Sequence, residues 1–83
     1  MTLLKIYHLS QNTNNDWDTY DSCVVCATSE ADAKSIDPNG LEFKPSPSYG
    51  SWARSINDIV CVEIGKANKD QKRGVIIASF NAG

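Results

Sequence analysis

The apolar residues of this chain are gathered into four short runs, separated by polar or proline-containing segments. Branched and aromatic side chains dominate the runs, which are 3–9, 22–27, 59–64 and 74–80. Such runs are typical of β-strands, and none is long enough for an extended helix. With 83 residues the chain can build one hydrophobic core but not two, so we expect a single domain over 1–83.

One short helix is predicted between the second and third runs. Ser29 can act as its N-cap, and Asp32 can complete a capping box. Ala33 and Ile36 then share an apolar face, and Pro38 ends the helical segment. The expected fold class is therefore α+β: a small, mostly antiparallel four-stranded sheet in the order β-β-α-β-β, with one short helix packed on a face.

The connections differ in composition. Residues 10–19 are rich in Asn, Asp and Thr, which favour turns. Residues 41–55 include prolines and lack periodicity, so we expect a surface loop of the kind that often carries function. Residues 65–73 hold three lysines and an arginine against Asp70 alone, so a hairpin between the last two strands would end in a cationic tip.

Charge and cysteine content limit the partners and the compartment. A formal net charge of −2 argues against general binding to nucleic acid, which requires clustered cations to displace counterions from phosphates. No apolar run approaches the ~20 residues that span a bilayer, so no membrane association is expected. The three cysteines are an odd number in apolar surroundings, which favours reduced, buried thiols and a cytoplasmic location. A chain this short would also gain stability from a partner subunit, so a homo-oligomer is expected.

Cys23 and Cys26 form a Cys-x-x-Cys pair which, with Cys61 and His8, would supply ligands for tetrahedral zinc. The residues between the pair, Val24 and Val25, belong to a predicted strand, so the two thiols should leave opposite faces of the sheet. One metal ion could not reach both thiols. We therefore expect structural cysteines, with no metal site and no cofactor.

Catalytic and cation-binding patterns are weak. Asn12, Asn14, Asp16 and Asp18 have the alternate spacing of a calcium loop, but Trp17 replaces the required glycine and no glutamate follows at the twelfth position. His8 is the only histidine, and no acid lies near it in sequence. No enzymatic activity is expected, although carboxylates that meet in space would escape sequence inspection.

Aromatic residues in the connections offer a candidate binding site. Tyr49 and Trp52 lie with Arg54 in one connection, while Trp17 and Tyr20 flank another. Trp, Tyr and Arg dominate the binding energy of protein interfaces. The alternative is that the tryptophans fill the core and seal the ends of the sheet.

Several segments together resemble a group of small tailed-phage and prophage proteins. They are Leu4 to Ser10, Asp18 to Ser22, Cys23-Val-Val-Cys-Ala27 with Ser29-Glu-Ala-Asp-Ala-Lys34, and Arg73 to Gly83. The resemblance brings no established activity or functional residue. It implies an accessory factor that binds a component of the host cell, including components of antiviral defence.

The leading hypothesis is therefore a non-enzymatic binding module. We expect it to be a phage accessory protein that binds and inhibits a host protein in the host cytoplasm. Its candidate contact residues are Tyr49, Trp52, Arg54, Lys69, Lys72 and Arg73. One alternative is a sponge for a small anionic ligand such as a nucleotide, with an aromatic ring on the base and Arg54, Lys72 or Arg73 on phosphate. Another is a hydrolase that uses Asp16, Asp18 or Asp21.

Overall fold

The computed structural model describes residues 4–14, 18–44 and 52–81. Four strands and two short helical segments follow one another along these residues. They are β1 (Lys5–Ser10), β2 (Thr19–Ala27), α1 (Glu30–Lys34), the 3₁₀ turn η1 (Ile56–Asp58), β3 (Val60–Lys66) and β4 (Gly74–Asn81). The predicted α+β class and the order β-β-α-β-β are confirmed.

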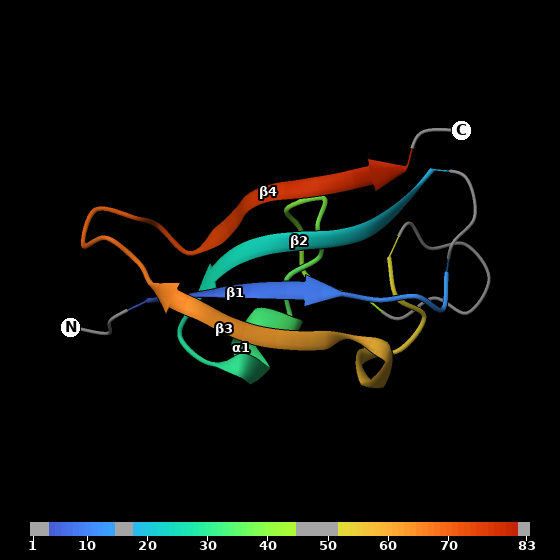
Figure 1. Ribbon diagram of the computed structural model, residues 1–83, viewed down its shortest axis with the longest axis horizontal. Coiled ribbons are helices and arrows are strands. Elements are labelled where there is room, and N and C mark those ends of the chain that lie inside the picture. Colours follow the sequence, from blue (N-terminus) through green and yellow to red (C-terminus); the bar gives the residue numbers. More distant parts are fainter. Residues whose placement is uncertain (1–3, 15–17, 45–51, 82–83) are drawn as a thin grey trace.

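The strands form one antiparallel sheet in the spatial order β3-β1-β2-β4 (Figure 1). Leu9 of β1 lies opposite both Cys23 of β2 and Cys61 of β3, and Cys23 in turn lies opposite Ala78 of β4. The first two strands are therefore central, and the last two form opposite edges.

The predicted hairpin between the last two strands is wrong, because two strands separate them. The residues between β3 and β4 instead cross over the end of the sheet (Figure 1). Three strand spacings amount to only ~14 Å, well within the reach of seven extended residues at ~3.3 Å each. We call residues 66–73 the cationic crossover.

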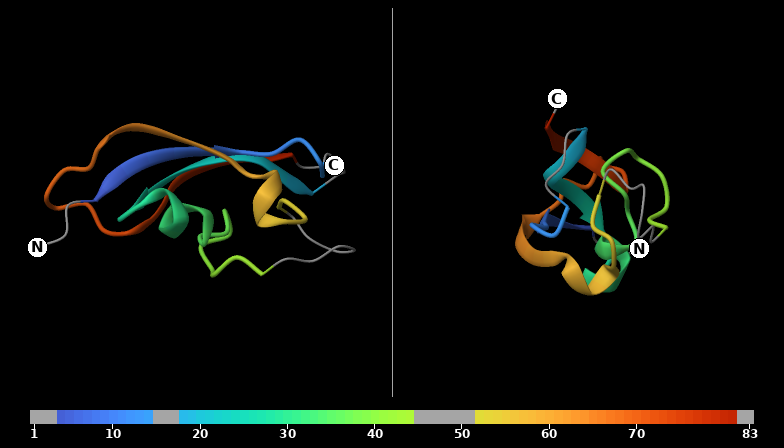
Figure 2. Two further views of the ribbon diagram at one scale, coloured as in Figure 1. Left: turned by 90° about the horizontal axis from the view of Figure 1, so that it is seen from below. Right: turned by 90° about the vertical axis from the view of Figure 1, so that its right-hand side faces the viewer.

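The core lies between the sheet and the segments that follow β2. Tyr7, Leu9, Cys23 and Val25 point from the central strands toward this side and are buried. The other members of the buried cluster are Ala27 of β2, Ala33 of α1, Ile36 just after that helix, Trp52 and Ala53 from the long connection, and Ile59. Figure 2 shows that α1 and η1 lie on one side of the sheet, so the described structure has two layers.

Helix α1 begins where the sequence predicts. The Ser29 hydroxyl accepts a hydrogen bond from the backbone N–H of Asp32 at 3.1 Å. The Asp32 carboxylate does not return to Ser29 as a capping box would require. It accepts instead from the backbone N–H and the hydroxyl of Thr28, at 2.9 and 3.1 Å.

The β1–β2 connection is organised by Gln11, which is buried. Its Nε2 donates to the carbonyls of Asn14 and Tyr20, both at 2.9 Å, and its Oε1 accepts from the backbone N–H groups of Thr13 and Asn14. Asn14 Nδ2 donates to the carbonyl of Trp52 at 2.9 Å. This side-chain network ties the connection to the long loop and satisfies backbone groups that no ladder reaches.

Candidate binding surfaces

The cationic crossover extends past the end of the sheet (Figure 1). Lys66, Lys69 and Lys72 are exposed, and Asp70 is the acidic residue among them. None of the three lysines takes part in an ion pair within the described ranges. Backbone hydrogen bonds fix the course of the crossover, from Ala67 N–H to the Leu4 carbonyl and from Gln71 N–H to the Asn68 carbonyl.

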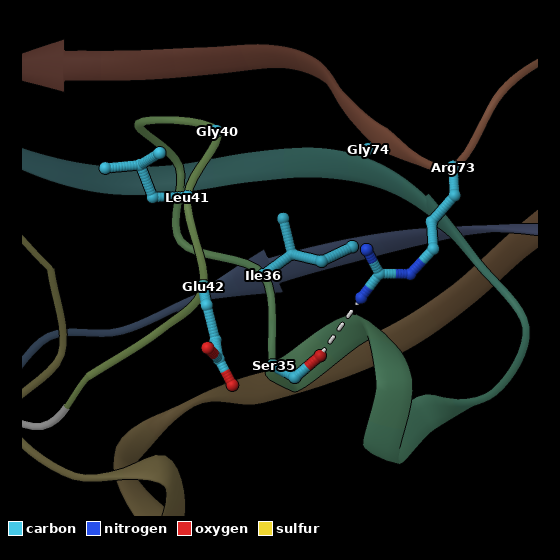
Figure 3. Close-up of a pocket in the computed structure, with 7 residues that line it drawn as sticks. All are labelled: Ser35, Ile36, Gly40, Leu41, Glu42, Arg73 and Gly74. Carbon is cyan, nitrogen blue, oxygen red and sulfur yellow. Dashed lines mark hydrogen bonds between the residues drawn. The ribbon is translucent and has the colours of Figure 1, made fainter.

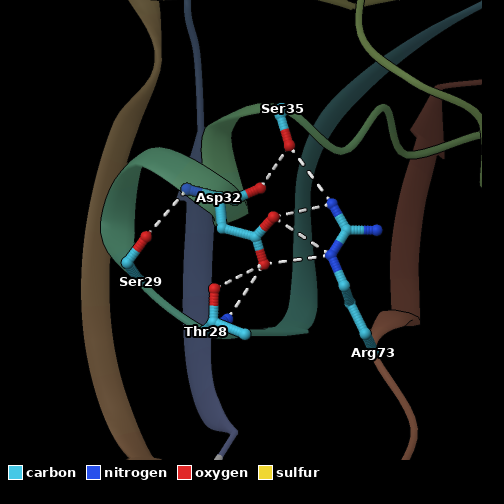
Figure 4. A network of polar contacts seen from close by, with 5 residues as sticks. All are labelled: Thr28, Ser29, Asp32, Ser35 and Arg73. Carbon is cyan, nitrogen blue, oxygen red and sulfur yellow. Dashed lines mark hydrogen bonds and ion pairs between the residues drawn. The ribbon is translucent and has the colours of Figure 1, made fainter. Parts of the chain in front are cut away.

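Arg73 is the last residue of the crossover, and its guanidinium binds the Asp32 carboxylate of α1 (Figure 4). Its Nε donates to both carboxylate oxygens of Asp32, at 3.1 and 3.0 Å, and its Nη2 donates to Oδ1 at 2.8 Å. Nη2 also lies 3.2 Å from the Ser35 hydroxyl. These bonds from Arg73, helped by those from Thr28, lower the pKa of Asp32 to about 2, and the carboxylate raises the pKa of Arg73. Arg73 therefore joins β4 to the helix.

A hollow of about 280 Å³ lies beside the Arg73 side chain (Figure 3). Its lining residues are Ser35, Ile36, Gly40, Leu41, Glu42, Arg73 and Gly74. The charge of Arg73 is offset by Asp32, and the hollow carries a second carboxylate on Glu42. Because carboxylates balance or exceed the single cation, the electrostatics of this hollow do not favour a nucleotide or another anion.

Trp52 is buried in the core, whereas a residue that contacts a partner protein must be exposed. Its side chain is 1% exposed and belongs to the core cluster, which corrects the expectation that it reaches a partner. Its Nε1 finds no acceptor among the described residues. Arg54 is exposed, so it does not share one surface with the buried Trp52, and Tyr49 falls outside the described residues.

The cysteines take the positions predicted from strand alternation. Cys23 faces the core cluster, while Cys26 lies three residues further along β2 and outside that cluster. Burial, with smaller effects from the Asp37 carboxylate and Cys61, raises the pKa of Cys23 to about 12. No group of three or more His, Cys, Asp or Glu side chains that could hold a metal ion occurs in the described part of the chain.

The described residues of the β1–β2 connection take structural roles. The Asn14 side-chain amide donates a hydrogen bond to the Trp52 carbonyl, and Asp18 adopts a left-handed backbone conformation with φ of 61°. Asp21 is exposed, and Asp16 falls outside the described residues. The hypothesis of a carboxylate-dependent hydrolase therefore stays a prediction.

Sequence reasoning missed one surface, the side of the sheet that faces away from α1. We call it the outer face and define it by Ile6, His8, Val24, Val60, Val62 and Ile77. A signal for it was present, because 59–64 is apolar at nearly every position rather than at alternate ones. The usual reading of such a run is a strand covered on both sides, but β3 is an edge strand with an exposed side.

Comparison with protein-family models, curated protein sequences and solved structures found no match, so the resemblance to phage proteins stays a prediction. Among the described residues, no helix has the length and apolar character needed to cross a bilayer.

Proposed function

We propose that the protein is a non-enzymatic binding module that presents the cationic crossover to an acidic surface of another protein. The observation that carries this proposal is the grouping of Lys66, Lys69 and Lys72, all exposed, on one connection at the end of the sheet. With the origin implied by the phage resemblance, the partner is a host protein, including proteins of antiviral defence, and the site of action is the host cytoplasm.

The charge distribution favours a compact acidic patch over a long polyanion. Three lysines against Asp70 give residues 66–72 a charge of +2, so the remainder of a chain with net charge −2 carries −4. A nucleic acid that ran beyond the crossover would meet this negative remainder, whereas a local cluster of Asp and Glu on a protein would not. Electrostatic attraction of this kind speeds association and weakens with salt.

Arg73 supports the proposal in a different role from the one predicted. Its bonds to Asp32 and Ser35 hold one end of the crossover against α1. A connection fixed at both ends loses less conformational entropy on binding than a free loop. The lysines therefore act as contact residues, and Arg73 acts as a positioning residue.

The test is capture from a nuclease-treated bacterial lysate with the full-length protein as bait. We compare wild type with K69E/K72E and with the control K44E/R54E, which changes the net charge equally at exposed cations elsewhere. We expect wild type and the control K44E/R54E to capture the same lysate protein, and K69E/K72E not to capture it. The captured protein should elute as the salt concentration is raised.

Three outcomes contradict the proposal. Equal capture by the crossover variant would show that the lysines make no contact. Loss in K44E/R54E with retention in K69E/K72E would move the site to the Arg54 side of the molecule. Capture that disappears with nuclease treatment would also contradict it, because the ligand would then be nucleic acid.

A further inference from the structure

Among the described residues, no helical segment covers the outer face, although Cys26, which lies opposite Ile6 on this side of the sheet, is fully buried. The helical turns and the described part of the long connection lie on the opposite side of the sheet (Figure 2). Strand register defines the surface: His8 of β1 lies between Val24 of β2 and Val62 of β3, and Val24 lies opposite Ile77 of β4. All four strands therefore contribute side chains to one continuous surface.

This surface is apolar and exposed. Val60, Val62 and Ile77 are 58%, 49% and 65% exposed, although each is an aliphatic residue within a strand. Where β2 and β4 meet, a shallow hollow of about 170 Å³ lies beside His8, Val24 and Ile77, and the hydroxyl-bearing Ser22 and Ser79 also line it. A contiguous apolar surface of this kind marks an interaction site rather than ordinary scatter of hydrophobic residues.

We propose that a second copy of this chain covers the outer face, so that two four-stranded sheets pack face to face as a sandwich. The size of the surface fits this occupant. Four strands that lie ~4.8 Å apart and are six to nine residues long, at ~3.3 Å per residue, give a face of about 19 by 25 Å, roughly 500 Å² for each partner. Two such faces together reach the ~1,000 Å² that a specific interface buries.

The chemistry of the surface favours a second copy over a different protein. The residues that define the outer face include no Asp, Glu, Lys or Arg. Interfaces between different proteins that associate reversibly are about as polar as the rest of the surface, whereas permanent homodimer interfaces resemble a core cut in half. The register also places Ser10, Ser22, Cys26 and Ser79 on this side of the sheet, and none of them is an acid or a base at neutral pH. Self-packing therefore brings no like charges together. Two such sheets would interdigitate ~10 Å apart, as in β-sandwich proteins.

This interface is separate from the cationic crossover. The crossover lies at the end of the sheet, beyond the strands whose side chains form the outer face (Figure 1). The dimer therefore leaves the lysines accessible. Failure of one proposal does not imply failure of the other.

The test is the molar mass of the full-length protein in solution, measured by light scattering and sedimentation from about 1 µM to about 1 mM. We expect twice the monomer mass of 9.1 kDa for wild type and the monomer mass for Val62→Asp. The control Leu41→Asp changes a side chain that is 69% exposed and lies outside the sheet, and it should stay dimeric. The variant K69E/K72E should also stay dimeric.

A second measurement guards against misfolding of Val62→Asp. In a mixed sample of labelled and unlabelled wild type, isotope-filtered NOEs should connect the methyl groups of Val24, Val62 or Ile77 between subunits. A monomeric wild type across the concentration range overturns the proposal, because the face would then serve another partner. A dimer whose intersubunit NOEs involve only residues outside the outer face overturns it as well.

Discussion

Trp52 illustrates how the role of a single residue depends on distant parts of the chain. It follows a connection rich in proline and serine, which locally favours exposure, yet its side chain is buried with Leu9 and Val25. Its carbonyl also accepts a hydrogen bond from Asn14, 38 residues earlier in the chain. The residue therefore stabilises the end of the core instead of contacting a partner.

Removal of this side chain should be costly. We expect Trp52→Ala to lower the free energy of unfolding by about 3–5 kcal/mol, because it removes a large buried ring and leaves a cavity. Trp52→Phe should cost less, since it keeps an aromatic ring at the same position. Urea denaturation at one fixed protein concentration measures both variants. A Trp52→Ala variant as stable as wild type would mean that the ring is not part of the core.

Local signals explain which residue roles were predictable. Ser29 begins α1 because capping depends only on the next few residues, so sequence was sufficient there. Strand alternation likewise placed Cys23 and Cys26 on different sides. The role of Trp52 depends on Asn14 and on the core, and no local pattern encodes those long-range contacts.

Between elements, the bond from Arg73 to Asp32 joins the start of β4 to the helix across 41 residues. Asp32 has a folded pKa of about 2 against an ordinary value of 3.8. A carboxyl with a lowered folded pKa binds its proton more readily when unfolded, so protonation favours unfolding. The stability from this pair should be complete above about pH 4 and should be lost as the pH falls toward 2.

The variant Arg73→Gln isolates this contribution. We expect it to lower the free energy of unfolding by about 1 kcal/mol at pH 6, in keeping with a partly exposed bidentate pair, and the difference from wild type should shrink as the pH falls through the folded pKa of Asp32, about 2. Lys72→Gln is the matched control, since it removes the neighbouring positive charge without breaking an ion pair in the described ranges. A difference that stays constant from pH 6 to pH 2 would contradict the assignment.

At the level of the whole molecule, both proposals depend on the strand order β3-β1-β2-β4. This order makes β3 and β4 opposite edges, sends the lysines across the end of the sheet, and brings side chains from all four strands to the outer face. Consecutive strands usually pair, which is why the sequence favoured a hairpin for residues 65–73. The number and type of the strands were predictable from local composition. Their pairing was not, because it depends on which edges of the central strands remain free.

The most direct test of this account is therefore the strand order in solution, measured by cross-strand Hα and amide NOEs in the isotope-labelled protein. The account predicts contacts between β1 and β3 in the register of Leu9 with Cys61, and between β2 and β4 in the register of Cys23 with Ala78. Backbone contacts between β3 and β4 in a hairpin register would contradict it, and would remove the structural basis of both the cationic crossover and the outer face.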